Sequence, residues 1–196
     1  MSAIVPGLKT LVFEEREPRI GVVTMNRAEQ RNAINREMLG EFEALFEALS
    51  RDDTIRVLVI TGAGRGFSSG ADLNDAVVFR DSQAFADPEN FLKIVQERYA
   101  SLILRMRRIP QPVIAAVNGP AAGGGFSMAL ASDVRFASPE AYFVASFINI
   151  GLSGGELGCS YLLPRLVGLS RASELLLPGR KVRAEEAERM GLVTRW

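Results

Sequence analysis

The chain has 196 residues and a mass of 21.4 kDa, of which 47% are hydrophobic and 23% charged. This balance predicts a soluble, globular single domain over residues 1–196. The 23 basic side chains equal the 23 acidic ones, so no net field favours nucleic acid, an anionic membrane or a polyanionic substrate. No apolar run approaches the roughly 20 residues that span a bilayer. With a single cysteine and no leader pattern, the sequence indicates the cytoplasm.

Histidine is absent from the sequence. This excludes Ser-His-Asp and Cys-His catalysis, and one cysteine cannot supply an ordinary zinc site. No lysine stands in the Gly-x-x-x-x-Gly-Lys-Ser/Thr pattern that cradles phosphates. We therefore expect no metal and no prosthetic group, and we expect acid–base chemistry to fall on carboxylates.

Hydrophobic periodicity in the first half predicts strands followed by a helix. Strands are expected at residues 10–14 and 20–25, and an amphipathic helix at 36–51. A buried-type strand at 57–61 then runs into a loop of small residues. The polar segment 74–89 has no clear period and is a candidate pocket wall.

The second half continues this alternation. We expect a long helix at 90–109, strands at 112–117, 134–137 and 142–145, and helices at 160–167, 171–177 and 184–190. Repeated strand, strand, helix units indicate an α/β fold.

The most informative stretch lies at residues 114–133, where the glycine triplet 123–125 joins a strand-like run to a helix-like run. A helix start leaves backbone N–H groups without partners, and glycine lets a ligand approach the main chain closely. The small-residue loop 62–73 exposes its main chain in the same way. Two N–H groups from separate loops, converging on one carbonyl oxygen, would form an oxyanion hole.

Six short motifs carry a family resemblance. They are MNRAEQRNA at 25–33, FSSGADL at 67–73, NGPAAGGG at 118–125, GLSGGELG at 151–158, LPRLVG at 163–168 and AEEAERMGLV at 184–193. In this order and spacing they resemble the crotonase (enoyl-CoA hydratase/isomerase) superfamily over residues 11–195. The resemblance implies a crotonase-like spiral of repeated ββα units, assembled as a homotrimer or dimer of trimers. It also implies an acyl-CoA substrate, with coenzyme A present as part of the thioester.

The same resemblance assigns roles by position. The first motif looks like the family's CoA-contacting turn, and the next two look like its oxyanion loops. The two oxyanion donors would be the backbone N–H groups of Ala71 and Gly124. Together with these two, Ala33, Asp72 and Leu73 would line the path of CoA and the acyl chain, largely through main-chain atoms.

The chain departs from the family pattern at two glutamates. Family hydratases carry one two residues after the glycine triplet and one on the loop after the next strand, and these positions hold Ser127 and Phe147. Neither side chain can activate water or protonate a carbon unaided. We therefore favour isomerase over classical hydratase chemistry. We expect Ser127 to pack in the first helical turn, Phe147 to lie in the pocket wall or core, and Asp133 to be the family's structural aspartate.

One acid, Glu156, stands where relatives such as dienoyl-CoA isomerases, hydroxyisobutyryl-CoA hydrolases and chlorobenzoyl-CoA dehalogenases carry an aspartate. A single carboxylate suffices for a double-bond shift, and it could also serve thioester hydrolysis. A structural alternative is equally open, because Ser153 and Glu156 fit a capping box before a helix at 158–167.

Four further interpretations remain. The chain could be a catalytically silent member that binds CoA esters or serves as an assembly subunit. A dinucleotide site at residues 62–66 is disfavoured, because those glycines do not open directly into a helix. Cys159 has no basic neighbour to activate it and is expected to be buried. Relatives typically continue with further helices, so the family's C-terminal helical region is expected to be absent or not included.

Overall fold

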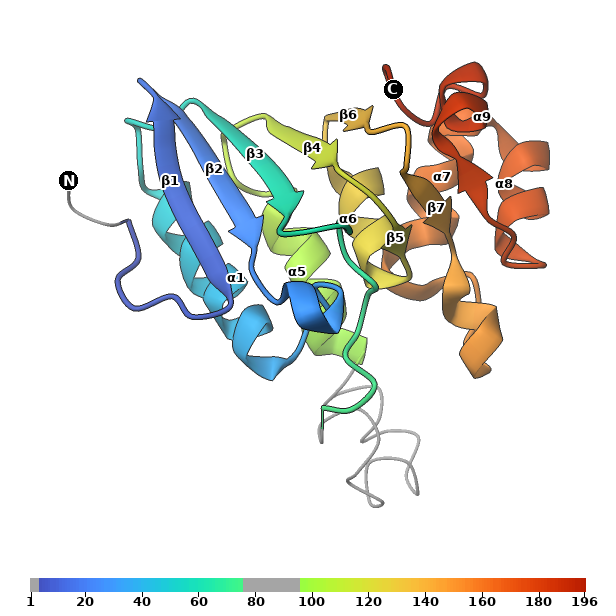
Figure 1. Ribbon diagram of the computed structural model, residues 1–196, viewed down its shortest axis with the longest axis horizontal. Coiled ribbons are helices and arrows are strands. Elements are labelled where there is room, and N and C mark those ends of the chain that lie inside the picture. Colours follow the sequence, from blue (N-terminus) through green and yellow to red (C-terminus); the bar gives the residue numbers. More distant parts are fainter. Residues whose placement is uncertain (1–3, 76–95) are drawn as a thin grey trace.

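The computed structural model describes residues 4–75 and 96–196 (Figure 1). Its larger sheet has five strands in the order β1-β2-β3-β4-β6. These are β1 (Leu11–Glu17), β2 (Ile20–Met25), β3 (Val57–Gly62), β4 (Val113–Val117) and β6 (Val134–Ala137). The β1–β2 pair is antiparallel, and β2, β3, β4 and β6 run parallel. The strands predicted in these regions are thereby confirmed.

A second sheet has three short strands in the order β5-β7-β8. They are β5 (Ala121–Ala122), β7 (Tyr142–Val144) and β8 (Val182–Arg183). The sequence predicted β7 but neither β5 nor β8. Since β5 lies between β4 and the glycine triplet, the chain does not pass directly from the predicted strand to the helix.

Helices cover one face of the larger sheet and its β6 edge (Figure 1). Within residues 4–75 and 96–196 the α-helices are α1 (Arg36–Ser50), α5 (Glu97–Met106), α6 (Gly124–Ala131), α7 (Cys159–Val167), α8 (Leu169–Leu176) and α9 (Ala184–Arg189). The 3₁₀ turns among the described residues are η1 (Ala28–Gln30), η3 (Ser146–Ile150) and η4 (Glu156–Gly158). Figure 1 shows α1, α5 and α6 on the sheet face, and α7 to α9 gathered beyond β6.

Two predicted segments fall partly outside the described residues. Within the predicted helix at 90–109, α5 runs over Glu97–Met106, while residues 90–95 lie outside the description. Most of the polar segment 74–89 also lies outside it. The helix predicted at 36–51 is confirmed as α1, whose first turn is capped by the Asn35 side chain accepting from the Met38 N–H.

Helix α6 lies in the centre of the molecule. All eight of its residues are buried, and the Phe126 ring packs 5.9 Å from that of Phe143 on β7. A helix that is apolar all round must be enclosed on every side. The packed neighbours therefore hold its N-terminal end, which carries the glycine triplet, in one place.

Candidate active site

The two glycine-rich loops meet at Gly70. A Cβ atom at this position would lie 2.8 Å from the backbone nitrogen of Gly124 and 2.8 Å from the carbonyl oxygen of Ala122. The φ of Gly70 is also +88°, in the left-handed region that side chains disfavour. Only glycine therefore permits both this backbone conformation and the close approach of the two loops.

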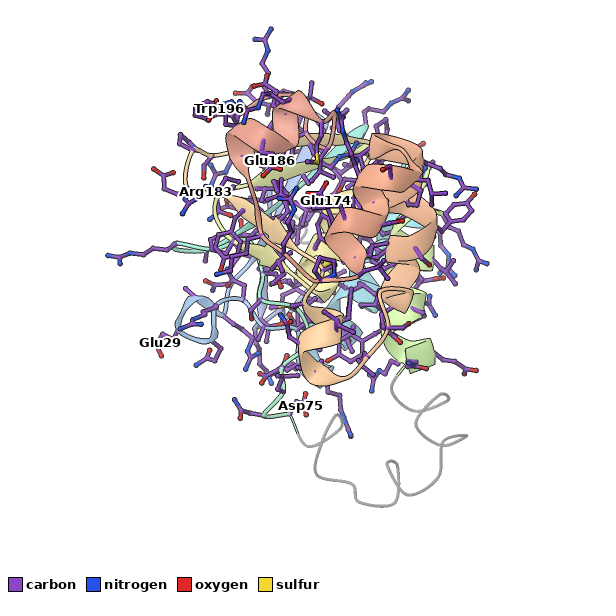
Figure 2. All side chains as sticks on the ribbon, turned by 90° about the vertical axis from the view of Figure 1, so that its right-hand side faces the viewer. Glu29, Asp75, Glu174, Arg183, Glu186 and Trp196 are labelled. Carbon is purple, nitrogen blue, oxygen red and sulfur yellow. The ribbon has the colours of Figure 1, made fainter. Side chains whose placement is uncertain are left out.

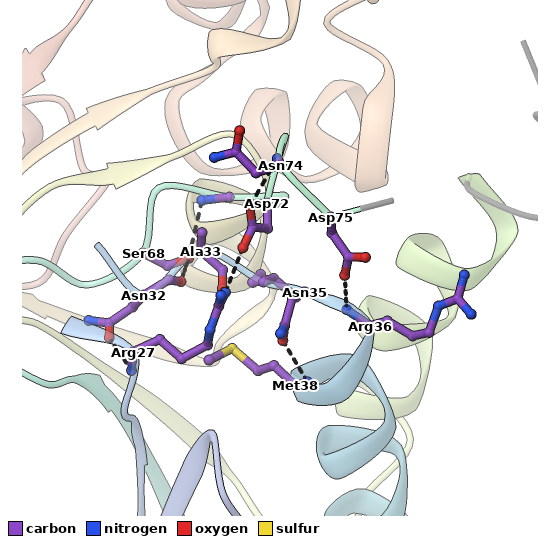
Figure 3. A network of polar contacts seen from close by, with 12 residues as sticks. Arg27, Asn32, Ala33, Asn35, Arg36, Met38, Ser68, Asp72, Asn74 and Asp75 are labelled. Atoms are coloured by element: carbon purple, nitrogen blue, oxygen red, sulfur yellow. Dashed lines mark hydrogen bonds and ion pairs between the residues drawn. The ribbon is translucent and has the colours of Figure 1, made fainter. Parts of the chain in front are cut away.

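Backbone hydrogen bonds also join these two loops at the residues that precede Gly70. The N–H groups of Phe67 and Ser68 donate to the carbonyl of Pro120 at 3.0 and 3.1 Å, and the N–H of Ala122 donates to the carbonyl of Ser68 at 2.9 Å. The Ser68 hydroxyl donates in turn to the carbonyl of Asn32 at 2.8 Å (Figure 3). The loops are thus fixed to each other and to the turn before α1.

Ala71 is held with its N–H group available. The N–H of Ile34 donates to the carbonyl of Gly70 at 2.8 Å, and the N–H of Asp72 donates to the carbonyl of Ile34 at 2.9 Å. This is a parallel bridge between Ile34 and Ala71. In such a bridge the intervening residue directs its own N–H away from the partner strand. Among the described residues, nothing accepts a hydrogen bond from the Ala71 N–H.

Gly124 supplies a second available N–H as the first residue of α6. The first N–H groups of a helix have no intrahelical acceptor and lie at the positive end of its dipole. Gly123, with φ +49°, turns the chain, and its own N–H donates to the carbonyl of Val144 at 3.0 Å. No acceptor for the Gly124 N–H occurs within residues 4–75 and 96–196. Gly124 and the Gly70–Ala71 segment are therefore neighbours, with two N–H groups that can receive a negative oxygen.

A groove of about 1000 Å³ lies beside Ala71. Four of the residues predicted to line the CoA and acyl path contribute to it, namely Ala33, Ala71, Asp72 and Leu73. Gly124 and Glu156 are not among its described lining residues.

The position of this groove can be followed on the molecule. Glu29 and Asp75 both line the groove, and Figure 2 shows them in the lower part of the molecule. Trp196 and Glu186 lie in the upper part of the same view. The groove is thus remote from the end of the chain.

An ion pair inside the groove wall joins the first motif to the loop at residues 62–73. Nη1 of Arg27 lies 2.8 Å from Oδ2 of Asp72, and the two side chains are only 18% and 10% exposed. The same Nη1 donates to the carbonyl of Ala33, and Oδ1 of Asp72 accepts from the N–H of Asn74 at 3.0 Å (Figure 3). Asp72 therefore shapes the groove, and its charge is engaged within the protein.

Glu156 begins η4, which packs against the start of α6. Oε1 of Glu156 accepts a hydrogen bond from Nε2 of Gln96 at 2.8 Å. Partial burial raises the pKa of the Glu156 carboxyl, and the hydrogen bond from Gln96 opposes this. Next in the chain, Leu157 places Cδ1 3.3 Å from where a Cβ of Gly124 would lie. The one candidate acid is therefore next in sequence to a residue that lies beside Gly124, at the start of α6.

The capping-box interpretation of Glu156 is wrong. Helix α7 begins at Cys159, and its N-cap is Gly158, with no side-chain capping bond. The Ser153 hydroxyl accepts from the N–H of Gly155 at 3.2 Å, whereas the Glu156 carboxylate is bonded to Gln96. Leu157 and Gly158 both have positive φ, and the turn they make separates Ser153 from the helix.

Ser127 and Phe147, which occupy the positions of the two family glutamates, are buried. The Ser127 hydroxyl lies 3.1 Å from Sγ of Cys159, and burial raises the pKa of this thiol to about 12. Phe147 is 6% exposed and lies in the hydrophobic core, with Cε1 3.8 Å from where a Cβ of Gly123 would be. The predicted packing of all three residues is confirmed.

The structural role predicted for Asp133 is also confirmed. Its Oδ2 accepts from the N–H of Val113 at 2.8 Å, and its Oδ1 accepts from Nη1 of Arg107 at 2.6 Å. The Arg107 guanidinium also donates to the carbonyl of Ala131, the last residue of α6. Asp133 thus ties the start of β4 to the end of α6.

Sequence reasoning missed Ile34, Gln96 and Leu157. Ile34 could have been suspected from its place directly after the first motif, but nothing in the local sequence marks the other two.

Among the described residues, no helix is long and apolar enough to cross a membrane. No group of three or more His, Cys, Asp or Glu in that part of the chain could hold a metal ion.

Comparisons with known proteins extend these observations. The model of the enoyl-CoA hydratase/isomerase family matches residues 15–196. A probable enoyl-CoA hydratase of Mycobacterium bovis is 48% identical over 196 residues, which cover 98% of this chain and 68% of that protein. The 1,2-epoxyphenylacetyl-CoA isomerase of Escherichia coli K12 is 40% identical over 182 residues, covering 93% of this chain and 68% of the relative.

Solved structures give the same result. A probable enoyl-CoA hydratase/isomerase from Mycobacterium abscessus superposes with a TM-score of 0.83 at 45% identity, covering 95% of this chain and 68% of that one. A monofunctional enoyl CoA isomerase from M. smegmatis has a TM-score of 0.77 at 43% identity, covering 95% and 76%. The chain thus spans about two thirds to three quarters of the length of these four relatives.

Proposed function

The chain belongs to the enoyl-CoA hydratase/isomerase family and has its crotonase fold, and we propose that it shifts a double bond in an acyl-CoA thioester. In this proposal Ala71 and Gly124 stabilise the thioester enolate, and Glu156 alone handles the proton. The observation that carries it is the pair of available N–H groups on adjoining loops, combined with an uncharged residue at both usual glutamate positions.

The two N–H groups suit the charge that develops during proton removal. When a proton leaves the carbon next to a thioester carbonyl, its electron pair moves onto the carbonyl oxygen. Donors already fixed by the bonds around Ile34 and by the buried helix α6 need no rearrangement to receive that charge. Loss of one such donor typically costs on the order of 10²- to 10³-fold in rate.

Glu156 can both accept the proton and return it. The carboxylate takes the proton from one carbon, the enolate forms, and the same carboxyl delivers the proton to a different carbon as the enolate electrons return. No atom is gained or lost, so no second acid is needed. Burial raises the pKa of Glu156, which makes it a better base than an exposed glutamate.

Coenzyme A would enter as part of the substrate. We propose that its path follows the groove formed by Ala33, Asp72 and Leu73, which leads to Ala71. The Arg27–Asp72 pair keeps that wall in place. Assembly as a homotrimer or dimer of trimers belongs to the same proposal.

Relatives of both reaction types are similar to this chain. Two that carry isomerase names are 40% and 43% identical to it, which supports the isomerase proposal, while the M. bovis relative carries a hydratase name. Ser127 and Phe147 also favour a second candidate, a catalytically silent subunit that binds CoA esters. Thioester hydrolysis, with Glu156 as base or nucleophile, and hydration are the remaining enzymatic alternatives.

One experiment separates these functions. The purified protein is incubated with crotonyl-CoA, 3-enoyl-CoA, 3,5-dienoyl-CoA and saturated acyl-CoA, and products are identified by mass and ultraviolet spectrum. A shifted double bond at unchanged mass is the expected result. A product heavier by one water would show that the protein is a hydratase instead. Release of free CoA would show that it is a hydrolase. Binding of these thioesters without turnover would establish the silent subunit.

A further inference from the structure

The side chain of Gln96 reaches Glu156 from a distant part of the chain. Gln96 directly precedes α5, and its Nε2 donates to Oε1 of Glu156 at 2.8 Å across 60 residues of sequence. Helix α5 packs against η4, so this contact belongs to a packed interface. Among the described residues, Oε1 has this donor and Oε2 has no hydrogen-bond partner.

The backbone of η4 constrains Glu156 from the other side. Leu157 has φ +52°, a conformation uncommon for a residue with a side chain, and Gly158 follows with φ +78°. The Leu157 side chain reaches the start of α6 beside Gly124. Glu156 is thus held at its backbone by this turn and at one carboxylate oxygen by Gln96.

An amide is suited to this position because it does not titrate. Its N–H donates at every pH and cannot take up the proton that Glu156 would carry. Its hydrogen bond favours the ionised carboxylate, while burial disfavours it.

Two of the helices that pack against η4 carry titratable groups. On α5 they are Glu97, Arg98, Tyr99 and Arg105, and on α7 they are Cys159, Tyr161 and Arg165. Helix α6, which also packs against η4, carries none. The Cys159 thiol is kept neutral by burial. Gln96 is therefore the neighbour that offsets the burial of the carboxylate.

We infer that Gln96 is a positioning residue for Glu156: its hydrogen bond holds Oε1 and favours the ionised carboxylate, so that Oε2 is the oxygen that takes and returns the substrate proton. This inference rests on the proposed function for its chemical meaning. The hydrogen bond and its effect on the ionisation of Glu156 can be tested separately from turnover.

The first test measures the ionisation of Glu156 directly. Protein with ¹³C-labelled glutamate carboxyls is titrated by NMR, and the Glu156 resonance is identified by its absence in Glu156→Gln. Gln96→Leu removes the donor at similar size, so the Glu156 midpoint should move to higher pH. Gln96→Glu adds a second carboxyl and should also raise it. The matched control, Glu97→Gln, changes an exposed neighbour and should leave the midpoint unchanged.

The second test compares the pH dependence of kcat in the same variants. A base works only when it is ionised, so the acid limb for Gln96→Leu should move to higher pH. At pH values below the midpoint, kcat should fall by up to about tenfold for each unit by which the midpoint moves, and it should recover as pH rises. KM should change little, because Gln96 is not among the residues that line the groove.

The outcomes separate the two proposals. An unchanged midpoint in a folded Gln96→Leu protein overturns the inference, as does a fall in kcat that higher pH does not restore. Activity that survives Glu156→Gln at near the original rate refutes the catalytic role of Glu156 instead. If the protein turns over no acyl-CoA but the Glu156 midpoint still moves in Gln96→Leu, the isomerase function is refuted. The effect of Gln96 on the ionisation of Glu156 would then still stand.

Discussion

Ile34 holds Ala71 by bonding to the residues on both sides of it. Its N–H donates to the Gly70 carbonyl at 2.8 Å, and its carbonyl accepts from the Asp72 N–H at 2.9 Å. That carbonyl also accepts from the Tyr99 hydroxyl at 2.7 Å. A buried residue of α5 thereby fixes Ile34, the residue that bridges to Ala71.

Tyr99→Phe should loosen this arrangement without unfolding the protein. Burial raises the pKa of the Tyr99 hydroxyl, so it stays protonated and donates throughout the usual pH range. Losing one buried hydrogen bond should lower the free energy of unfolding by about 1 kcal/mol. Urea unfolding measures this change, and kcat should fall with it. Tyr161→Phe alters an exposed tyrosine and should change neither value; equal effects of the two variants would contradict the assignment.

Gly70→Ala should abolish activity. The new methyl group would lie 2.8 Å from the Gly124 nitrogen, where the substrate oxygen is proposed to bind, on a backbone with φ +88°. We expect a loss of at least about 10²-fold in kcat/KM, as for removal of an oxyanion donor, and a lower melting temperature. Gly40→Ala in α1 is the control, because no atom outside the neighbouring backbone of the same helix lies within 4 Å of its Cβ position. It should stabilise the protein by about 0.5–1 kcal/mol and leave kcat unchanged.

Glu156→Gln should separate activity from stability. Turnover should fall by roughly 10²- to 10⁴-fold through loss of the base, while affinity for CoA esters persists. Burial raises the folded-state pKa of Glu156, so the folded protein holds this proton more tightly than the unfolded chain. Its contribution to stability is therefore present below the unfolded pKa and declines as pH rises toward the folded pKa.

Urea unfolding at different pH values tests whether the contribution of Glu156 to stability declines as pH rises. Glutamine does not titrate, so the stability of Glu156→Gln should not decline in this way as pH rises. The measurement compares urea unfolding midpoints of the two proteins below the unfolded-state pKa and above the folded-state pKa of Glu156. An identical pH dependence in the two proteins would show that burial does not perturb this carboxyl.

Asp72→Ala should weaken substrate binding more than turnover. The substitution leaves the little-exposed Arg27 guanidinium without its partner, and it releases the wall that carries Leu73. We expect a raised KM for acyl-CoA and a loss of about 1–3 kcal/mol in the free energy of unfolding. Glu185→Ala breaks an exposed pair with Arg189 and should cost less than about 0.5 kcal/mol. A KM unchanged by Asp72→Ala would place the CoA path elsewhere.

Local patterns in the sequence predicted much of the fold. Helix α1 follows from six apolar residues at helical spacing and an Asn35 cap, and β3 from a short apolar run before small residues. These features depend on neighbours within a few residues, which is the range that periodicity and capping describe. The strands β5 and β8 have only two residues each. They exist through pairing with β7, which no local pattern encodes.

The sequence by itself determined which groups the proposed site could use: glycine-rich loops for backbone donors, no histidine, and Glu156 as the candidate acid. Tertiary structure decided how those groups are held. The capping box fitted the sequence around Glu156, yet its carboxylate bonds to Gln96, 60 residues away. Likewise Ile34, not the loop itself, sets the direction of the Ala71 N–H. Such partners become neighbours only when packing brings distant segments together, so their roles depend on the folded chain.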